Sequence, residues 1–252
     1  MAEKELLTVK DKSSKKEKSL RVNFYELYKN CPIPPNEILN NLGLFINRRS
    51  LSKIIFMHKL YKKILDVHGI IIEFGVRWGQ NLALFEAFRG MYEPYNYTRK
   101  ILGFDTFEGF PSIHEKDGFD KAKVGYYSVS ENYKDYLKKV LDYHEGESPI
   151  SHIKKYELVK GDASITIKKY LEDNPETIIA LAYFDLDLYE PTKNVLEAIK
   201  PYLTKGSIIG FDELTHPDFP GETLALKEVF ELNQLRIHRS TSHSYPTYFV
   251  FE

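Results

Sequence analysis

Acidic residues follow two apolar runs in the second half of the chain. Asp185 and Asp187 follow one run, and Asp212 and Glu213 follow the next. The runs are typical of buried strands, and in an open α/β sheet the carboxyl ends of neighbouring strands face one crevice. Carboxylates gathered there repel one another unless protons or a cation intervene. Because the ligands are all oxygens, the pattern predicts a site for Mg²⁺ or a similar hard cation. Strand-end acids that simply point to solvent are the alternative interpretation.

A glycine-containing turn joins an earlier apolar run to a helical pattern. Residues 70–81 read I-I-I-E-F-G-V-R-W-G-Q-N, so that Glu73, Gly75 and Gly79 have the spacing Glu-x-Gly-x-x-x-Gly. This order of strand, tight turn and helix N-terminus brings backbone N–H groups to a small ligand. The spacing matches neither the dinucleotide fingerprint nor the nucleoside triphosphate P-loop. Arg77 in the turn is either a ligand for a carboxylate or phosphate, or an ordinary surface arginine.

Two more strand ends carry polar residues suited to a nucleoside. Asp105 ends a short apolar run, where a carboxylate accepts hydrogen bonds from both ribose hydroxyls; a plain turn residue is the alternative. Gly161 allows the backbone to approach a ligand closely. Asp162, which follows it, either accepts from an exocyclic amine such as that of adenine or caps the next helix. The sequence leaves both interpretations of Asp162 open.

Strand and helix patterns alternate from residue 70 onward, which predicts a doubly wound α/β sheet. The expected strands are 70–75, 101–105, 153–159, 178–185, 206–211, 235–239 and 246–251. The expected helices lie near 79–90, 131–144, 164–172, 190–200 and 222–233. The last two strands are joined by a loop too short for a parallel crossover, so they must pair as an antiparallel hairpin. The expected fold is a Rossmann-like, mostly parallel seven-stranded sheet.

The N-terminal part of the chain has a different composition. Residues 1–20 are lysine-rich and predict a flexible tail, and residues 21–68 predict a helical extension that acts as a lid. Within that extension, Ser50 is expected to cap a long helix and Gly69 to end it. The catalytic domain would then span residues 69–252, with residues 108–150 inserted over the substrate site.

Overall composition excludes several classes of partner. The 252 residues are 42% hydrophobic and 28% charged with a formal net charge of −1, so no positive field favours nucleic acid or acidic lipid. No apolar run approaches the roughly 20 residues that cross a bilayer. The charged N-terminus does not resemble a secretion signal, so we expect no export, and Cys31, the single cysteine, fits the expectation of a reducing cytoplasm.

Four of these stretches together resemble the macrocin O-methyltransferase family, over roughly residues 68–252. They are the glycine turn at 75–79, D-T-F-E-G-F-P at 105–111, D-L-D-L-Y at 185–189 and F-D-E at 211–213. The resemblance implies a class I fold and S-adenosylmethionine as the methyl donor, with a divalent metal, usually Mg²⁺. It further implies a sugar acceptor, nucleotide-linked in some pathways of polysaccharide or natural-product synthesis, and a homodimer.

The resemblance also implies roles for individual residues. Asp185, Asp212 and Glu213 would bind the metal, and Asp187 would act as general base. The residues expected to bind the donor are Glu73, Gly75, Arg77, Gly79, Asn81, Asp105, Thr106, Phe107, Gly161, Asp162, Ala163 and Asp185. Two departures stand out: the family commonly has a second aspartate at the position of Glu213, and a glycine-glycine-small run where this chain has G-Q-N at 79–81.

Two other functions share the expected fold. A catechol-type methyltransferase uses the same metal chemistry but binds a flat aromatic acceptor. A non-catalytic subunit would retain the fold and bind ligand without turnover, although the intact acidic cluster argues against it. A nucleic-acid methyltransferase is disfavoured because the charge is balanced and no base-reading motif is present.

Overall fold

The computed structural model describes residues 13–118, 122–242 and 245–252. The chain divides into two compact units, Met1–Lys53 and Ile54–Glu252. Within the described ranges, no helix is both long and apolar enough to cross a membrane.

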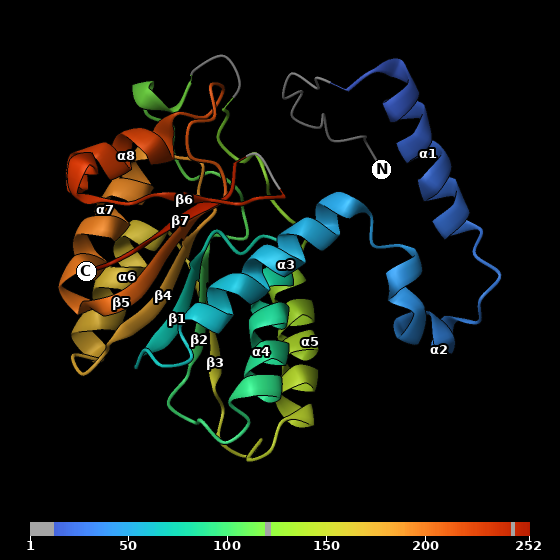
Figure 1. Ribbon diagram of the computed structural model, residues 1–252, viewed down its shortest axis with the longest axis horizontal. Coiled ribbons are helices and arrows are strands. Elements are labelled where there is room, and N and C mark those ends of the chain that lie inside the picture. The colour runs from blue at the N-terminus through green and yellow to red at the C-terminus, as the bar shows by residue number, and fades with distance from the viewer. Residues whose placement is uncertain (1–12, 119–121, 243–244) are drawn as a thin grey trace. The chain divides into compact units, whose positions relative to one another are not determined.

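The larger unit is built on one seven-stranded sheet with the order β3-β2-β1-β4-β5-β7-β6 (Figure 1). The strands are β1 (Ile70–Phe74), β2 (Ile101–Asp105), β3 (Tyr156–Lys160), β4 (Ile179–Phe184), β5 (Leu203–Phe211), β6 (His238–Arg239) and β7 (Thr247–Val250). The first five are parallel, and β7 pairs antiparallel with both β5 and β6. The predicted mostly parallel sheet with a C-terminal antiparallel hairpin is therefore confirmed.

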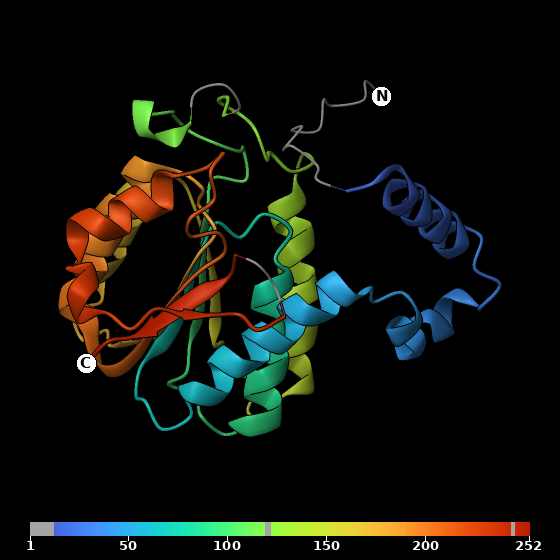
Figure 2. The same ribbon diagram turned by 45° about the horizontal axis from the view of Figure 1, so that its top comes forward.

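Helices cover both faces of the sheet (Figure 2). They are α3 (Arg48–Lys63), α4 (Gln80–Tyr92), α5 (Tyr133–Glu147), α6 (Ala163–Asp173), α7 (Tyr189–Ile199) and α8 (Gly221–Val229). The alternation of side chains along β1 explains the two cores. Ile71 packs with α3, α4 and α5 on one face, whereas Ile70 and Ile72 pack with α6, α7 and α8 on the other.

The strand order places one edge of the sheet where a ligand is expected. From β1 the chain crosses to β2 on one side, and β4 pairs with β1 on the other. In open α/β sheets, ligands bind at the carboxyl ends of the strands beside such a switch point. The loops that follow β1, β2, β4 and β5 all leave from this edge, and they carry the residues singled out in the sequence.

The first part of the chain corrects the predicted tail and domain boundary. Helix α1 (Lys15–Lys29) starts before residue 20, because Ser14 and Glu17 form a capping box at its N-terminus; residues 1–12 lie outside the described ranges. α2 (Pro35–Ile38) and the 3₁₀ helix η1 (Leu39–Leu44) follow. The domain boundary lies after Lys53 rather than after residue 68. Apolar residues of α3 such as Leu60 are fully buried in the core, so this part of the predicted extension packs within the larger unit. The role of the extension as a lid stays a prediction.

Two predicted ends of helix α3 are also wrong. The side chain of Asn47 accepts hydrogen bonds from the backbone N–H groups of Arg49 (2.9 Å) and Ser50 (3.1 Å), so Asn47 caps the helix and Ser50 lies inside it. The helix ends at Lys63 rather than at Gly69. Gly69, with φ of +131°, is needed because a Cβ there would lie 2.5 Å from the carbonyl oxygen of Ile178.

A buried acidic residue lies in the core between α4, α5 and β3, away from the strand-end loops. Glu86 is 1% exposed, and neither of its carboxyl oxygens has a hydrogen-bond partner. Its neighbour Glu145 is paired with Arg89 at 3.2 Å and with Lys155. Burial raises the pKa of Glu86 to about 8, with the Arg89 charge opposing that shift. With this raised pKa, we expect Glu86 to be mostly protonated in the folded protein at pH 7.

We expect Glu86→Gln to change the pH dependence of stability. The folded-state pKa is raised above the value of the unfolded chain, so the wild-type protein loses stability as the pH rises from about 4.5 toward about 8. The loss can reach roughly 4 kcal/mol at about 1.4 kcal/mol per pKa unit. The glutamine variant, which cannot ionise, should match the wild type at pH 5 and melt at a higher temperature at pH 8. If the melting temperatures of both proteins change in the same way between pH 5 and pH 8, the raised pKa of Glu86 is contradicted. Glu172→Gln on the surface of α6 is the control.

Candidate active site

The loop between β1 and α4 is held tightly against the end of β4. Gly75 (φ +88°) and Gly79 (φ +74°) both have left-handed backbones. A Cβ on Gly75 would overlap the carbonyl oxygen of Asp185, and one on Gly79 would overlap the side chain of Leu137. The backbone contact leaves room only for glycine at Gly75, whereas at Gly79 another residue would have to displace the side chain of Leu137. The tight turn predicted from the sequence is present, and it joins the first strand-end loop directly to the acidic residue after β4.

Glu73 and Asn81, both expected to bind the donor, stabilise this loop through a hydrogen bond between the strand and the helix that flank it. Glu73 at the end of β1 is 1% exposed, and Asn81 in the first turn of α4 is 4% exposed. The Asn81 amide donates a hydrogen bond of 2.6 Å to Oε1 of Glu73. This bond connects the end of the strand to the start of the helix, so both residues shape the loop. Direct contact of either residue with the donor stays a prediction.

Asp105 connects the first loop to the second. Its carboxylate accepts hydrogen bonds from the backbone N–H groups of Arg77 (2.7 Å) and Phe107 (2.5 Å). Both residues have positive φ, 48° and 58°, and the carboxylate stabilises these turns. Burial raises the pKa of Asp105, and the backbone hydrogen bonds oppose that rise. Thr106 donates from Oγ1 to the carbonyl of Gly109 at 2.7 Å, which closes the second loop. Asp105 therefore has the turn role, and the hydrogen bonds to ribose stay a prediction.

In the third loop, after β3, the structure confirms the capping interpretation of Asp162. Its side chain accepts from the N–H of Ser164 at 2.8 Å, so Asp162 is the N-cap of α6. Gly161 (φ +141°) donates its N–H to the carbonyl of Asp105 at 2.9 Å, and Ala163 is buried as the first residue of α6. Capping uses one carboxylate oxygen, so acceptance from adenine remains a prediction for the other.

The structure brings the four strand-end carboxylates together. Burial, then the charge of Asp187 and a hydrogen bond with it, raise the pKa of Glu213 to about 11. Asp212, whose charge acts in the same direction, accepts a 2.9 Å hydrogen bond from the hydroxyl of buried Tyr183. Asp185 and Asp187 both raise the pKa of a further buried carboxyl, that of Glu222. Crowding of this kind favours bound protons or a bound cation.

Glu222 is a member of this cluster that the sequence did not reveal. It lies in the first turn of α8 and is fully buried. Its Oε1 accepts hydrogen bonds from the backbone N–H groups of Leu186 (3.0 Å) and Asp187 (3.3 Å). Its Oε2 is buried without a hydrogen-bond partner. In the sequence this residue is only one acid at a helix N-terminus, where acids are common.

The insertion at residues 108–150 reaches the same cluster through Tyr127. The Arg77 guanidinium lies over the Tyr127 ring, 4.6 Å from its centre. Burial raises the pKa of Tyr127, and the charges of Asp187 and Glu213 raise it further. Tyr127 therefore lies close to the acidic side chains, at the place where the insertion was expected to cover the substrate. The sequence alone did not distinguish this tyrosine from its neighbour Tyr126.

Comparison with solved structures identifies the family. A crystal structure of CalS11, a calicheamicin methyltransferase, is 45% identical, with a TM-score of 0.92 over 100% of this chain and 98% of that one. An apo structure of CalS11, described as a TDP-rhamnose 3′-O-methyltransferase, is 44% identical, with a TM-score of 0.83 over 95% and 96% of the two chains. This chain belongs to the macrocin-type O-methyltransferase family. It is an S-adenosylmethionine-dependent enzyme of class I.

A further comparison, at low sequence identity, concerns the fold of the methyltransferase and not its function. The O-methyltransferase NovP is 16% identical, with a TM-score of 0.64 over 79% of each chain, and shows the same fold. No protein-family model and no curated protein sequence matches the chain.

The acidic cluster of the methyltransferase does not form a ready metal site. Among the residues that the structure describes, no group of three or more His, Cys, Asp or Glu side chains is arranged to hold a metal ion. Two of the expected ligands have other partners, because Glu213 is hydrogen-bonded to Asp187 and Asp212 to Tyr183. The metal ligands implied by the resemblance lie in this one cluster. Their coordination of a metal ion stays a prediction.

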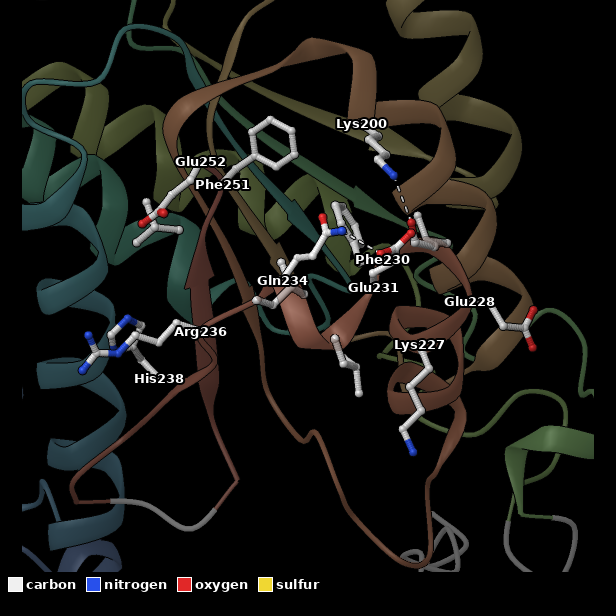
Figure 3. A pocket seen from close by; sticks show the side chains of 14 residues that line it. Lys200, Lys227, Glu228, Phe230, Glu231, Gln234, Arg236, His238, Phe251 and Glu252 are labelled. Atoms are coloured by element: carbon white, nitrogen blue, oxygen red, sulfur yellow. Dashed lines mark hydrogen bonds between the residues drawn. The ribbon is translucent and has the colours of Figure 1, made fainter.

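A separate cavity of about 860 Å³ lies at the other end of the strands (Figure 3). It lies beside the start of β5 and the end of β7, which runs antiparallel to β5. Its lining includes both basic side chains, such as Lys227 and Arg236, and acidic ones, such as Glu231. This mixture of charges selects no ligand class, and the cavity does not include any of the strand-end carboxylates.

Proposed function

We propose that the methyltransferase transfers a methyl group from S-adenosylmethionine to a hydroxyl of a nucleotide-linked sugar in natural-product or polysaccharide synthesis. The observation that most directly supports this proposal is the cluster of carboxylates beside the glycine loop, where Gly75 packs against the backbone of Asp185. The full-length similarity to an enzyme described as a TDP-rhamnose 3′-O-methyltransferase supports a sugar acceptor of this kind.

Asp187 is the proposed general base. A sugar hydroxyl is a poor nucleophile at neutral pH and must lose its proton as it attacks the sulfonium methyl group. Asp187 projects from the turn between β4 and α7, and its hydrogen bond with Glu213 shows that its carboxylate lies within the cluster. The carboxylate would accept the hydroxyl proton when the C–O bond forms and the methyl–sulfur bond breaks. The other cluster members would hold the hydroxyl in line with the methyl group.

Asp185, Asp212 and Glu213 would hold a divalent cation, Mg²⁺ or a similar hard ion. The donor atoms fit, since carboxylate oxygens are the ligands that such ions prefer. Burial raises the pKa of Glu213, and the neighbouring charge of Asp187 raises it further, so a bound cation would favour the ionised carboxylate. When bound, the ion would lower the pKa of the acceptor hydroxyl. This assignment requires Glu213 to exchange its hydrogen bond with Asp187 for a metal contact.

The donor would bind over the loops that follow β1, β2 and β3. These loops present the backbone of Gly75 and Gly79 together with Asp105 and Asp162 at one edge of the sheet. The N-terminus of α4 points its free N–H groups at this edge, which suits the carboxylate of the donor. Arg77 above Tyr127 would then contact either that carboxylate or a phosphate of the acceptor.

A panel of acceptors tests the proposed reaction. The enzyme with S-adenosylmethionine and Mg²⁺ should methylate TDP-rhamnose or a related TDP-deoxysugar and leave catechol unchanged, as judged by the mass of the products. Methylation of catechol alone would favour the catechol-type alternative. Binding of S-adenosylhomocysteine with no turnover on any nucleotide sugar would favour the non-catalytic subunit.

The methyltransferase is also proposed to be a cytoplasmic homodimer. The described helices α1, α2 and η1 have no buried residue, and they expose large apolar side chains. These are Leu20, Val22, Tyr25, Leu27, Tyr28, Leu39, Leu42 and Leu44. Exposed apolar surface of this extent commonly marks a protein interface. Cys31 is a free thiol, which fits a reducing compartment. Light scattering on the purified protein tests the dimer.

A further inference from the structure

The turn that carries Asp187 is conformationally demanding. Asp187 has φ of +62°, a left-handed backbone that is unfavourable for most L-residues. Helix α7 begins two residues later, at Tyr189. The backbone N–H groups in this turn face the protein interior, where an unpaired donor is costly. Aspartate tolerates a left-handed backbone better than most residues, so it is the partners of these buried N–H groups that fix the shape of the turn.

The N-terminus of α8 supplies two of those partners through one side chain. Oε1 of Glu222 accepts from the N–H of Leu186 at 3.0 Å and from the N–H of Asp187 at 3.3 Å. Glu222 is fully buried, so water does not replace these hydrogen bonds. One carboxyl oxygen therefore fixes both peptide groups on the N-terminal side of the left-handed residue.

Two neighbouring contacts hold the other side of the turn. Asp117, which is 1% exposed, accepts from the N–H of Tyr189 at 2.5 Å. Gly221 lies so close that a Cβ there would be 2.7 Å from the carbonyl oxygen of Asp187 and 2.6 Å from the nitrogen of Tyr189. The start of α8 is thus packed directly against the backbone of the turn, and Glu222 is the next residue along that helix.

We propose that Glu222 is a positioning residue, which holds the Leu186–Asp187 backbone so that the Asp187 carboxylate faces the acceptor hydroxyl. The inference rests on the proposed function for the role of Asp187, but not for the shape of the turn. Because Glu222 acts as an acceptor for two N–H groups, an uncharged acceptor of the same length should serve equally well. A side chain without an acceptor should release the turn.

The test compares three substitutions. Glu222→Met keeps the volume but leaves two buried N–H groups without an acceptor, whereas Glu222→Gln keeps a carbonyl oxygen for both. Glu86→Met is the matched control, since Glu86 on α4 is an equally buried carboxyl whose two oxygens accept no hydrogen bond. If Glu222→Met does not fold, Glu222→Asp, which is one methylene too short, takes its place.

Amide hydrogen exchange is the first measurement, because it needs neither substrate nor turnover. The amides of Leu186 and Asp187 should exchange at least tenfold faster in Glu222→Met, and at the wild-type rate in Glu222→Gln and Glu86→Met. With a nucleotide sugar that the wild type methylates, Glu222→Met should lower kcat about tenfold or more with KM for S-adenosylmethionine unchanged. Glu222→Gln should restore kcat to within about threefold.

The outcomes separate this inference from the proposed function. Unchanged exchange in Glu222→Met overturns the inference whatever the reaction proves to be. Faster exchange with wild-type kcat also overturns it, provided that Asp187→Asn is inactive. If Asp187→Asn is fully active, the proposed base is wrong, and the exchange data alone then show that Glu222 shapes the turn without positioning a base. A kcat loss in Glu86→Met equal to that in Glu222→Met would assign the effect to general loss of a buried carboxyl and overturn the inference.

Discussion

Asp187→Asn should lower kcat about 10³-fold, within the range of about 10²–10⁴ typical of a lost general base. Asparagine is close in size to aspartate and adopts left-handed backbones more readily than most residues, so the turn at φ +62° should survive. What the variant loses is the ability to accept the proton of the acceptor hydroxyl. The measurement is the steady-state rate of methyl transfer to the sugar acceptor, together with the affinity for S-adenosylhomocysteine, which should stay within about twofold of the wild type.

The control for this substitution is Asp173→Asn, the same change on the exposed end of α6, which should leave kcat unchanged. A melting curve like that of the wild type would show that the fold of Asp187→Asn is intact. Turnover in Asp187→Asn within tenfold of the wild type would exclude Asp187 as the general base. Glu213, the neighbour with which it shares a hydrogen bond, would then be the next carboxylate to examine.

Removal of divalent cations is expected to have the second large effect. The proposed ligands Asp185, Asp212 and Glu213 form an all-oxygen site, and a bound hard cation would offset their mutual repulsion while it activates the acceptor hydroxyl. Excess chelator should therefore lower the rate of methyl transfer about 100-fold or more. Added Mg²⁺ should restore it, and binding of S-adenosylhomocysteine should change little. A rate that is unaffected by chelator would show that no exchangeable cation is needed.

Substitutions at the ligands separate metal binding from general damage. Asp212→Asn should raise the Mg²⁺ concentration that gives half-maximal rate, because it removes one anionic ligand. Glu213→Asp restores the acid that the family commonly has at that position, so it should stay active with a shifted Mg²⁺ requirement. If both variants show the wild-type dependence on Mg²⁺, these carboxylates are not the ligands. The lost hydrogen bond from Tyr183 to Asp212 is controlled by Tyr183→Phe, which should leave the Mg²⁺ dependence unchanged.

Much of the fold follows from local features of the sequence. Apolar runs of five or six residues, separated by helical patterns, correspond to β1, β2 and β4 almost residue for residue. The antiparallel hairpin follows from a short loop that excludes a parallel connection. The acids at the ends of β4 and β5 are close together because parallel neighbours end at the same edge of the sheet. The strands and the hairpin thus depend on nearby residues, whereas the meeting of the acids depends on the parallel pairing of β4 with β5.

The tertiary structure decided what depends on residues far apart in the chain. Glu222 supports Asp187 from 35 positions away, and Tyr127 from the insertion lies over Arg77 of the first loop. No spacing rule links such residues, because their contact depends on how helices and loops pack after the sheet has formed. The same holds for α3 in the first half of the chain. Its C-terminal part is buried because it packs against the sheet, which the local sequence does not reveal. The sequence by itself therefore determined the elements, the strand-end acids and the family resemblance. Packing alone decided which buried groups shape the turn around Asp187, since burial and hydrogen bonding between distant segments exist only in the folded chain.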